Sequence, residues 1–528
     1  MKETASTHSK NAFLVASGIF LSRIFGFLRE RAIAHYFGNS FLADAFKAAY
    51  RIPNLLQNLL GEGVLSASFI PVYAQLIAQK KTKEANQLAA SIFWILFCVV
   101  FALSLLGAIF AAELTAFIAP GFSGETLSVT INLVRILFPG TAILVLSAWC
   151  LGILNTHSKF FLSYSAPVIW NLTQIVVLLF VAQKAMGVAL IEALAWSLLF
   201  GSFLQFAIQL PQVFNFTSHL WPTLKLGASE KAVIKNFFPV LFSRGVSQIS
   251  AYVDIWFASL LPVGAVSSMS FAQMLYLLPI SLFGMSISAA ELPAMSRAQG
   301  SQEEINEALK KRIVSGSSRI AFFVIPSVVV FLVLGDVLIG LVFQSGAFSH
   351  NNTLDVWRAL GGSAVGLLAA TVGRIYSSAF YALKDTKTPM RFAFIRVFLT
   401  IGLGYLMGIR LPEYLHISSM WGLTGLTASA GIAGWIEFFL LRNALSKRIG
   451  NIYIPAQLIL KLWTISLFSG GLAYFLYKIV FIAKLELHVF FAGALDLFIF
   501  SATYIVFAVI FKIDQVQMIT QKVQRLRK

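Results

Sequence analysis

The sequence predicts an all-α, polytopic membrane protein with about fourteen transmembrane helices. Of the 528 residues, 58% are hydrophobic and only 12% are charged, which is about half the charged fraction of a soluble globular protein. Apolar stretches of roughly 20–28 residues recur along the chain, and a helix of that length crosses a hydrocarbon core of about 30 Å. The stretches lack the alternation over about ten residues that marks a membrane β-barrel, so we expect helical spans.

The apolar stretches define fourteen expected spans. The first span is expected to be retained, because no small-residue cleavage site follows it. The two cysteines, Cys98 and Cys150, lie far apart inside apolar stretches and predict neither a disulfide framework nor a metal site. The expected spans cover residues 11–37, 44–79, 87–111, 128–155, 159–183, 188–214, 232–261, 264–298, 309–334, 353–383, 389–409, 419–444, 456–480 and 487–511.

The distribution of basic residues predicts the orientation of the chain in the membrane. With the N-terminus inside, roughly 24 of the 40 Lys and Arg fall on the inner side and about four on the outer side. The net charge of +18 therefore reports topology, not nucleic-acid binding, and both termini are expected to be cytoplasmic. The inner group includes KKTK at 80–83, Lys225, Lys231, Lys235, KKR at 310–312, Lys384, Lys387, Arg391, Arg442, Lys447, Arg448 and the tail QKVQRLRK; the outer group is Lys184, Arg410, Lys478 and Lys484.

Two halves of the chain resemble one another. The second span contains DAFKAAYRIPNLL with Pro53 and Pro71, and the eighth contains MSFAQMLYLLPISLF with Pro279 and Pro293. The loop sequence GILNTHSKFFL is echoed by FYALKDTKTPMRF in the second half. Spans 1–6 and 7–12 are therefore expected to be two copies of one six-helix unit, related by a pseudo-two-fold axis along the membrane normal.

This duplication predicts an N-terminal lobe over residues 1–215, a C-terminal lobe over 216–450, and a final segment over 451–528 with two further helices and a basic cytoplasmic tail. Two facing bundles leave a cleft near the pseudo-axis, where transporters of this kind bind substrate and rock between two states. The final two helices form either a peripheral packing pair or a lateral, lipid-facing groove.

Polar residues form a stripe along the second span. They recur at intervals of three or four residues, so they share one face of a helix whose other faces are apolar. Intramembrane charges usually face a protein interior or a water-filled cavity, so this stripe is expected to line the cleft, with internally neutralised packing as the alternative. Its members are Asp44, Lys47, Arg51, Asn54, Asn58 and Glu62.

The first span carries four charges in LSRIFGFLRERAIAHYFG, residues 21–38. On a helix, Arg29 lies about 120° from Arg23, and Arg31 about 80° the other way. We expect Arg23 and Arg29 to face the cleft, Glu30 to moderate their charge, and Arg31 to reach the outer interface. Arginine suits phosphate because its fork makes bidentate contacts and stays charged when desolvated. Structural ion pairing is the alternative.

The second half is less basic within its spans, so one wall of the expected cleft is cationic and the other is mixed. That arrangement suits an anionic head group better than an organic cation. The intramembrane charges of the second half are Arg244, Asp254, Glu291, Arg358, Arg374, Arg396 and Glu437.

The stretches SRIFGFLRERAIAHYFG, ADAFKAAYRIPNLLQNLLGEGVLSASFIPVYAQ and FYALKDTKTP resemble the MurJ (MviN) family of lipid II flippases. This family belongs to the superfamily of multidrug, oligosaccharidyl-lipid and polysaccharide (MOP) exporters. The resemblance covers essentially the whole chain and is most specific in the first 75 residues. It implies that the chain moves lipid II, the undecaprenyl-diphosphate-linked disaccharide pentapeptide, from the inner to the outer leaflet of a bacterial plasma membrane, for peptidoglycan synthesis, cell wall biogenesis and cell shape.

The resemblance also implies which residues bind substrate. One departure is Met274, which stands just before Pro279 where the family has a third cavity arginine; Arg244 is a candidate to supply the missing charge. By position, Arg23 and Arg29 match the family's helix 1 arginines that bind the diphosphate, and Glu30 replaces a neighbouring acidic residue. Asp44 and Glu62 match acidic positions, and Arg51 and Arg374 match basic positions.

Other functions are less consistent with the residues. A MATE-like drug exporter would need an acidic cavity, and a flippase for another polyprenyl-diphosphate-linked glycan would differ only in head-group contacts. An enzyme is not expected, because the seven histidines lie at loops or helix ends without a matched acidic cluster. No nucleotide-binding loop or cofactor motif occurs, so membrane potential or Na⁺ remain as energy sources. We expect a monomer.

Overall fold

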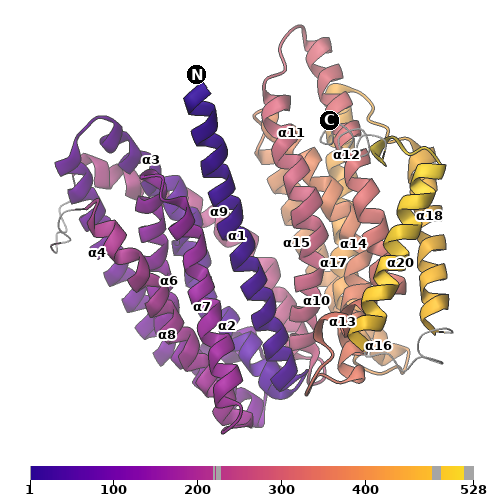
Figure 1. The fold of residues 1–528 in the computed structure, drawn as a ribbon, viewed down its shortest axis with the longest axis horizontal. Helices are drawn as coiled ribbons and strands as arrows, with labels where there is room; N and C mark the ends of the chain where they lie inside the picture. The colour runs from indigo at the N-terminus through magenta and orange to yellow at the C-terminus, as the bar shows by residue number, and fades with distance from the viewer. Residues whose placement is uncertain (1, 218–220, 222–226, 479–488, 517–528) are drawn as a thin grey trace. The chain divides into compact units, whose positions relative to one another are not determined.

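The computed structural model describes residues 2–217, 221, 227–478 and 489–516, without the side chains of residues 2–13, 242–244, 246–247 and 249–251. Within these ranges the chain forms helices and short loops and contains no β-strand, which confirms the predicted fold class (Figure 1). The side chain of Arg244 and the basic tail QKVQRLRK lie outside the described residues.

The chain divides into two compact units, Met1–Val266 and Ser267–Lys528. The first unit is built around α6 (Gly124–Thr156), which packs against six other helices and is the most buried of the long helices described here. The other helices of this unit are α1 (Lys2–Phe37), α2 (Phe41–Leu60), α3 (Glu62–Ala78), α4 (Thr82–Ile109), α5 (Ala111–Ile118), α7 (Phe160–Val181), α8 (Gly187–Phe214) and α9 (Ala228–Ser259).

The second unit is built around α14 (His350–Ala382), which packs against α12 (Gln302–Val333) and α17 (Trp421–Ile449). Its remaining elements are α10 (Ala265–Pro279), the π-helix η1 (Ile280–Met285), α11 (Ser286–Ser296), α13 (Gly335–Phe343), α15 (Lys387–Gly404), the π-helix η2 (Tyr405–Arg410), α16 (Leu411–Tyr414), α18 (Ala456–Leu476) and α20 (Val489–Ile510).

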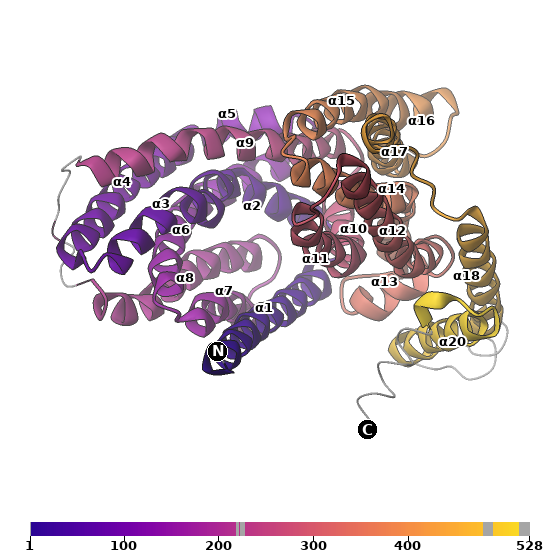
Figure 2. The same cartoon turned by 90° about the horizontal axis from the view of Figure 1, so that it is seen from above.

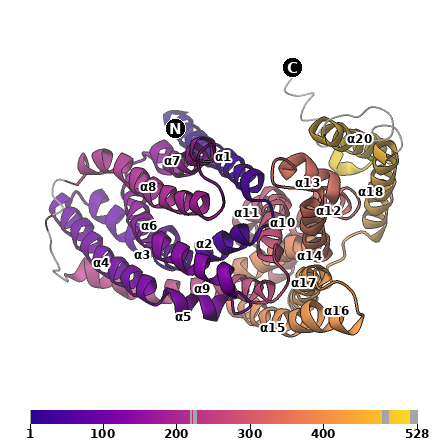
Figure 3. The same ribbon diagram turned by 90° about the horizontal axis from the view of Figure 1, so that it is seen from below.

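The last two long helices, α18 and α20, pack against each other and chiefly against α12 and α13 of the second unit. Figures 2 and 3 show them at the edge of that unit, beyond α12 and α13. Asp496 in α20 is fully buried, and neither of its carboxylate oxygens has a hydrogen-bond partner among the described residues. A place at the edge of the unit is compatible with both alternatives for these helices, the peripheral packing pair and the lateral groove, so both stay predictions.

Twelve helices, some of them interrupted, are long and apolar enough to cross a membrane in the described part of the chain. Each coincides with one of the expected spans, and the two remaining expected spans, 11–37 and 232–261, coincide with the long helices α1 and α9. The sequence therefore located all fourteen long helices. The division into lobes at residues 215 and 450 stays a prediction. The two compact units are defined by contacts alone, and they meet between Val266 and Ser267.

A left-handed turn recurs at the echoed loops of the two halves. Ser158, between α6 and α7, has φ = 59°, and Lys384, between α14 and α15, has φ = 60°. In each turn the next residue donates its backbone N–H to a carbonyl five residues earlier: Lys159 to Leu154 at 2.8 Å, and Asp385 to Phe380 at 2.9 Å. The two turns are 226 residues apart, as are Pro53 and Pro279, so they occupy equivalent positions in the expected repeat; the same type of turn also follows other helices, at Lys80, His416 and Lys512.

The second expected span is not one continuous helix. It breaks at Gly61, which has ψ = −148° and separates α2 from α3. A Cβ atom at this position would lie 2.3 Å from the carbonyl oxygen of Gln57, so only glycine fits. Pro53 and Pro71 lie inside α2 and α3 and do not end either helix. The break redirects the residues that follow Asn58, so the polar stripe is not a single straight face.

Candidate functional site

A charged cluster joins α1 to α2 in the N-terminal unit. Glu30 lies at its centre: Arg29 Nη2 donates to Glu30 Oε1 at 2.5 Å, and Lys47 Nζ pairs with Glu30 Oε2. The side chains of Arg29 and Glu30 are each 15% exposed, and that of Lys47 is 9% exposed. Two cations share one carboxylate, so these three side chains carry a net positive charge that is largely withdrawn from solvent.

Helix α7 holds Arg29 from the other side. Arg29 Nη1 donates to Asn171 Oδ1 at 3.0 Å, and the guanidinium carbon lies 4.9 Å from the centre of the Trp170 ring. Asn171 is itself fixed, because its Nδ2 donates to the carbonyl of Pro167 at 2.9 Å. Arg29 Nε is buried without a hydrogen-bond partner among the described residues. The planar guanidinium therefore has a defined orientation.

The contact between α1 and α7 has a cause in the sequence. A Cβ atom at Gly18 would lie 2.8 Å from Cβ of Tyr164, so glycine permits the close approach of the two helices. Arg29 follows eleven residues later, about three turns along and on nearly the same face. The same face of α1 therefore packs on α7 at Gly18 and delivers Arg29 to Trp170 and Asn171.

The other helix 1 arginines are placed differently. Arg23 lies on an exposed part of α1, and Arg31 is partly buried. This separation agrees with the angles expected from their spacing, since one straight helix cannot direct all three arginines at one point. The expectation that Arg23 and Arg29 contact the same ligand stays a prediction.

The predicted residues of the second span have different surroundings. Asp44 is 3% exposed and accepts a hydrogen bond from the backbone N–H of Gly264 at 2.6 Å, so it holds the loop before α10. The carbonyl of Arg51 accepts a hydrogen bond from the hydroxyl of Tyr252 in α9 at 3.1 Å. Glu62 is the first residue of α3 and is exposed. The stripe therefore includes one residue with a clear structural role.

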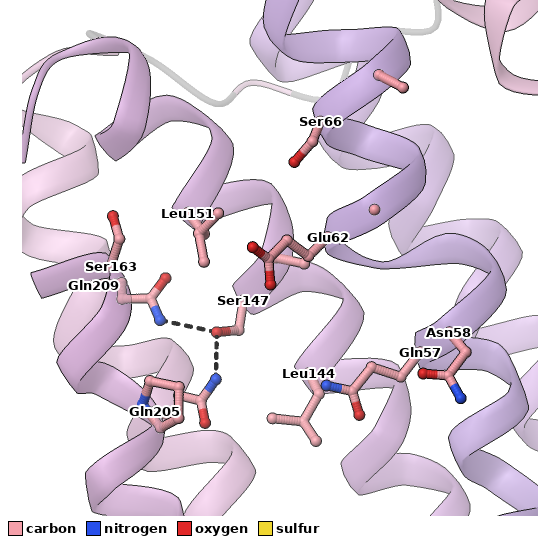
Figure 4. Close-up of a pocket in the computed structure, with 14 residues that line it drawn as sticks. Gln57, Asn58, Glu62, Ser66, Leu144, Ser147, Leu151, Ser163, Gln205 and Gln209 are labelled. Carbon is pink, nitrogen blue, oxygen red and sulfur yellow. Dashed lines mark hydrogen bonds between the residues drawn. The ribbon is translucent and has the colours of Figure 1, made fainter. Parts of the chain in front are cut away.

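A polar cavity of about 600 Å³ lies inside the N-terminal unit, between α2, α3, α6, α7 and α8. Figure 4 shows Glu62 and Gln57 near its centre and two glutamines of α8 that donate to one serine of α6. Because Pro167 lines the cavity and its carbonyl binds Asn171, the cavity adjoins the site of Arg29. The lining residues are Gln57, Asn58, Glu62, Gly63, Ser66, Ala67, Leu144, Ser147, Ala148, Leu151, Ser163, Pro167, Gln205 and Gln209.

The C-terminal unit contains a second set of intramembrane charges. Arg396 in α15 pairs with Glu437 in α17 at 3.1 Å, and the exposed Arg374 of α14 lies within electrostatic range of both. Glu291 in α11 is 6% exposed and accepts hydrogen bonds from two arginines of α12. Met274 is a partly buried residue of α10. Glu291 and Glu437 therefore each pair with arginines of a neighbouring helix.

Sequence reasoning identified Arg29, Glu30 and Lys47 but not their partners in α7. It also missed the glutamine pair of α8 that lines the cavity. A usable signal was present, because Gln205 and Gln209 are four residues apart on one face of an apolar helix, as are Pro167 and Asn171. These residues are neutral, and a neutral polar side chain in an apolar helix is a weaker signal than a charge.

The long apolar helices and the intramembrane charges define a multi-pass membrane protein, and its fold matches that of a solved member of the MOP exporter superfamily. In fold, the chain resembles a solved inward-facing MATE family transporter of that superfamily, with a TM-score of 0.60 and 18% identity over 83% of this chain and 98% of that one. A family model described as lipid II flippase MurJ matches residues 33–501. The chain therefore belongs to the MurJ family of lipid II flippases.

Individual relatives agree with this assignment. The chain is 32% identical to a probable lipid II flippase MurJ of Bdellovibrio bacteriovorus over 85% of its own length and 84% of that protein. It is 30% identical to the lipid II flippase MurJ of Burkholderia cenocepacia over 84% and 85% of the two chains. A solved structure of a lipid II flippase MurJ in an inward-closed conformation matches 96% of this chain and 100% of that one, with a TM-score of 0.77 and 26% identity.

Proposed function

We propose that this chain flips lipid II from the inner to the outer leaflet of a bacterial plasma membrane and so supplies peptidoglycan synthesis. The observation that carries the proposal is the family match over residues 33–501. Of the charged cluster, Lys47 lies within this match, and Arg29 and Glu30 lie just before it. The task is physical: a large polar head group must cross a hydrocarbon core that excludes it, while the polyprenyl tail stays in lipid. Transport of this kind requires no catalytic residue.

The charged cluster is suited to a diphosphate. Glu30 holds Arg29 and Lys47 side by side, so one anionic group that displaced the carboxylate would meet both cations. Charge-assisted hydrogen bonds from arginine to phosphate are strong and geometrically specific. Trp170 and Asn171 fix the guanidinium before substrate arrives, which reduces the ordering cost of binding. We therefore assign the diphosphate to Arg29 and Lys47, with Arg23 and Arg51 as further contacts.

Two related functions are less favoured. The likeness to MATE transporters rests on fold alone at 18% identity, and the helix 1 cluster has a positive balance that does not suit a cationic drug. A flippase for another polyprenyl-diphosphate-linked glycan would use the same diphosphate chemistry. Lipid II is favoured over such a glycan because the matching family and the relatives of this chain are named as lipid II flippases.

Alternating access, orientation and energy source belong to the same proposal. The positive-inside distribution supports cytoplasmic N- and C-termini. Movement of the helix 1 charges through the membrane field would couple transport to the potential, at about 2.3 kcal/mol per elementary charge per 100 mV. Coupling to Na⁺ is the alternative energy source, and a monomer suffices for rocking of two units within one chain.

Depletion of the protein in its native bacterium tests the proposal. We expect lipid II to accumulate in the inner leaflet, as measured by leaflet-specific labelling. An unaltered distribution of lipid II, together with loss of another surface glycan, would refute the assignment of substrate.

Reconstitution tests the role of the cluster. In proteoliposomes with labelled lipid II, Arg29→Ala should reduce flipping at least tenfold and Arg29→Lys should retain part of it, because lysine keeps the charge but not the fork. The matched control is Arg410→Ala, which removes a 59% exposed arginine paired with Glu413 at 3.2 Å and should flip at the wild-type rate. Equal activity of Arg29→Ala and Arg410→Ala would remove Arg29 from the site.

A further inference from the structure

The cavity of the N-terminal unit has a lining unlike the charged cluster next to it. Among the described side chains, its polar groups are amides and hydroxyls with the single carboxylate of Glu62, and none of the lining residues is Lys or Arg. Such groups both donate and accept hydrogen bonds, so they match a neutral, amide- or hydroxyl-bearing ligand. The volume of about 600 Å³ lies in the range of small-molecule sites, roughly 300–1,000 Å³, and is far larger than a bare cation requires.

Hydrogen-bonding capacity in this cavity is left unused. Ser147 Oγ accepts from Gln205 Nε2 at 3.0 Å and from Gln209 Nε2 at 2.9 Å, so its own hydroxyl hydrogen is available to an acceptor. Gln209 is 1% exposed, and its Oε1 has no hydrogen-bond partner among the described residues. Buried polar atoms in proteins are almost always paired. The amide oxygen on the wall of this cavity is therefore an acceptor available to a donor group on an occupant, whether water or ligand.

The cavity lies at a defined distance from the charged cluster. Along α2, Lys47 and Gln57 are ten residues apart, or roughly 15 Å at 1.5 Å per residue. Along α7, Pro167 lines the cavity and binds Asn171, which in turn binds Arg29. An extended peptide covers about 3.3–3.6 Å per residue. One sugar and two or three residues of a stem peptide therefore bridge the gap between a diphosphate at Arg29 and the cavity.

We propose that this cavity binds the stem peptide of the lipid II head group, through Ser147, Gln209 and the neighbouring amides of α2. The inference rests on the proposed function, because it takes the head group from that assignment. Backbone amides of the peptide supply donors for Gln209 Oε1 and acceptors for the hydroxyl of Ser147. The N-acetylated sugars present the same amide and hydroxyl chemistry, but they lie closer to the diphosphate.

Binding measurements on the purified full-length protein test the inference. The probes are lipid II, the same lipid-linked disaccharide without its peptide, and undecaprenyl diphosphate, each titrated by native mass spectrometry. We expect the wild type to bind lipid II at least tenfold more tightly than the probe without peptide. The variants Ser147→Ala and Gln209→Leu should reduce that ratio towards one, while the affinity for undecaprenyl diphosphate stays unchanged.

The controls separate this inference from folding defects and from the proposed function. Gln174→Leu replaces a glutamine of α7 that is also 1% exposed but lies outside the cavity lining, and it should keep the wild-type ratio. Ser66 lines the cavity at an exposed position, so Ser66→Ala leaves the buried core intact. This variant should lower the ratio two- to threefold. Cavity variants that all keep the wild-type ratio would overturn the peptide assignment. A wild type that binds lipid II and the probe without peptide equally well, and loses affinity only for undecaprenyl diphosphate, would also overturn it. A wild type that binds lipid II but does not flip it would instead contradict the proposed function.

Discussion

Lys47 of α2 pairs with Glu30 of α1, although the sequence offers Lys47 the acidic Asp44 one turn away on its own helix. Asp44 is used elsewhere, as the acceptor for the backbone N–H of Gly264. The inter-helix pair ties α1 to α2 near the ends joined by a short loop, and the carboxylate also holds Arg29. A single side chain therefore sets the positions of two cations.

Removal of the Glu30 carboxylate should destabilise the protein. Glu30→Gln leaves Arg29 and Lys47 side by side with little solvent, and breaking a buried ion pair costs about 3–5 kcal/mol. Thermal unfolding in detergent would show this as a lowered midpoint. Glu413→Gln, which breaks an exposed pair, should cost less than about 1 kcal/mol. If the double variant Glu30→Gln/Lys47→Met restores the unfolding midpoint, the penalty comes from the uncompensated cation. Equal midpoints for Glu30→Gln and Glu413→Gln would contradict a structural role for the pair.

Replacement of Asp496 should stabilise the protein. Its side chain is fully buried in α20, and its two carboxylate oxygens have no hydrogen-bond partner among the described residues. Burial of an unpaired polar group costs about 1–3 kcal/mol by mutational measurement. Asp496→Leu, which keeps the branched shape and the number of heavy atoms, should therefore raise the unfolding midpoint, with Leu497→Ala as a neighbouring substitution that should lower it. A lowered midpoint for Asp496→Leu would show that the carboxylate has a compensating partner.

The loop between α14 and α15 should lose stability in acid. Hydrogen bonds from the backbone N–H and the hydroxyl of Thr388, with the nearby Arg448, lower the pKa of Asp385 from 3.8 to about 2. A carboxyl whose pKa is lower in the folded state stabilises that state fully above its unfolded pKa of about 4. The contribution is lost as pH falls towards 2. The difference in midpoint between wild type and Asp385→Asn should therefore be constant from pH 7 to 5 and shrink from pH 4 to 3, and a pH-independent difference would refute it.

Substitution of Gly61 should interfere with the break between α2 and α3. A methyl group would lie 2.3 Å from the Gln57 carbonyl oxygen, so Gly61→Ala forces a backbone shift, and overpacking of this kind costs about 1–3 kcal/mol. Gly373→Ala in α14, where no atom lies within 4 Å of the added carbon, is the matched control and should be neutral or stabilising. Equal unfolding midpoints for the two variants would show that the break adapts to a side chain.

The charge that replaces the missing family arginine remains to be identified. From the sequence, we predict that Arg244 supplies it, since Met274 stands at the family position. Arg244→Ala and Arg244→Gln should then each lower lipid II flipping at least fivefold in proteoliposomes, because neither keeps the charge. Wild-type flipping by both variants would exclude Arg244 from diphosphate binding.

Much of the fold was predictable because apolar length and turn residues determine it locally. The fourteen expected spans coincide with long helices, and the loop echo coincides with a repeated turn at Ser158 and Lys384. The break at Gly61 was not predicted, because a glycine between Leu60 and Glu62 is equally compatible with a continuous helix. Its effect depends on the contact with Gln57, which only coordinates reveal.

The candidate site was predicted in part. Spacing placed Arg29 and Glu30 at a functional face, because charge in an apolar helix is a strong signal. The choice of Glu30 as the partner of Lys47 depends on how α1 and α2 pack, and spacing along one helix cannot supply it. The cavity residues of α6 and α8 were missed for the same reason, since neutral side chains acquire their role only from the three-dimensional arrangement.

The break at Gly61 has a mechanical consequence. It divides one membrane span into two rods, and the cavity wall contains Asn58 from the end of the first rod and Glu62 from the start of the second. A ligand that touches both residues bridges the joint, so its binding energy acts on the angle between the rods. Occupation of the cavity and bending of this span are then a single event, and the joint converts the presence of cargo into a change of helix direction.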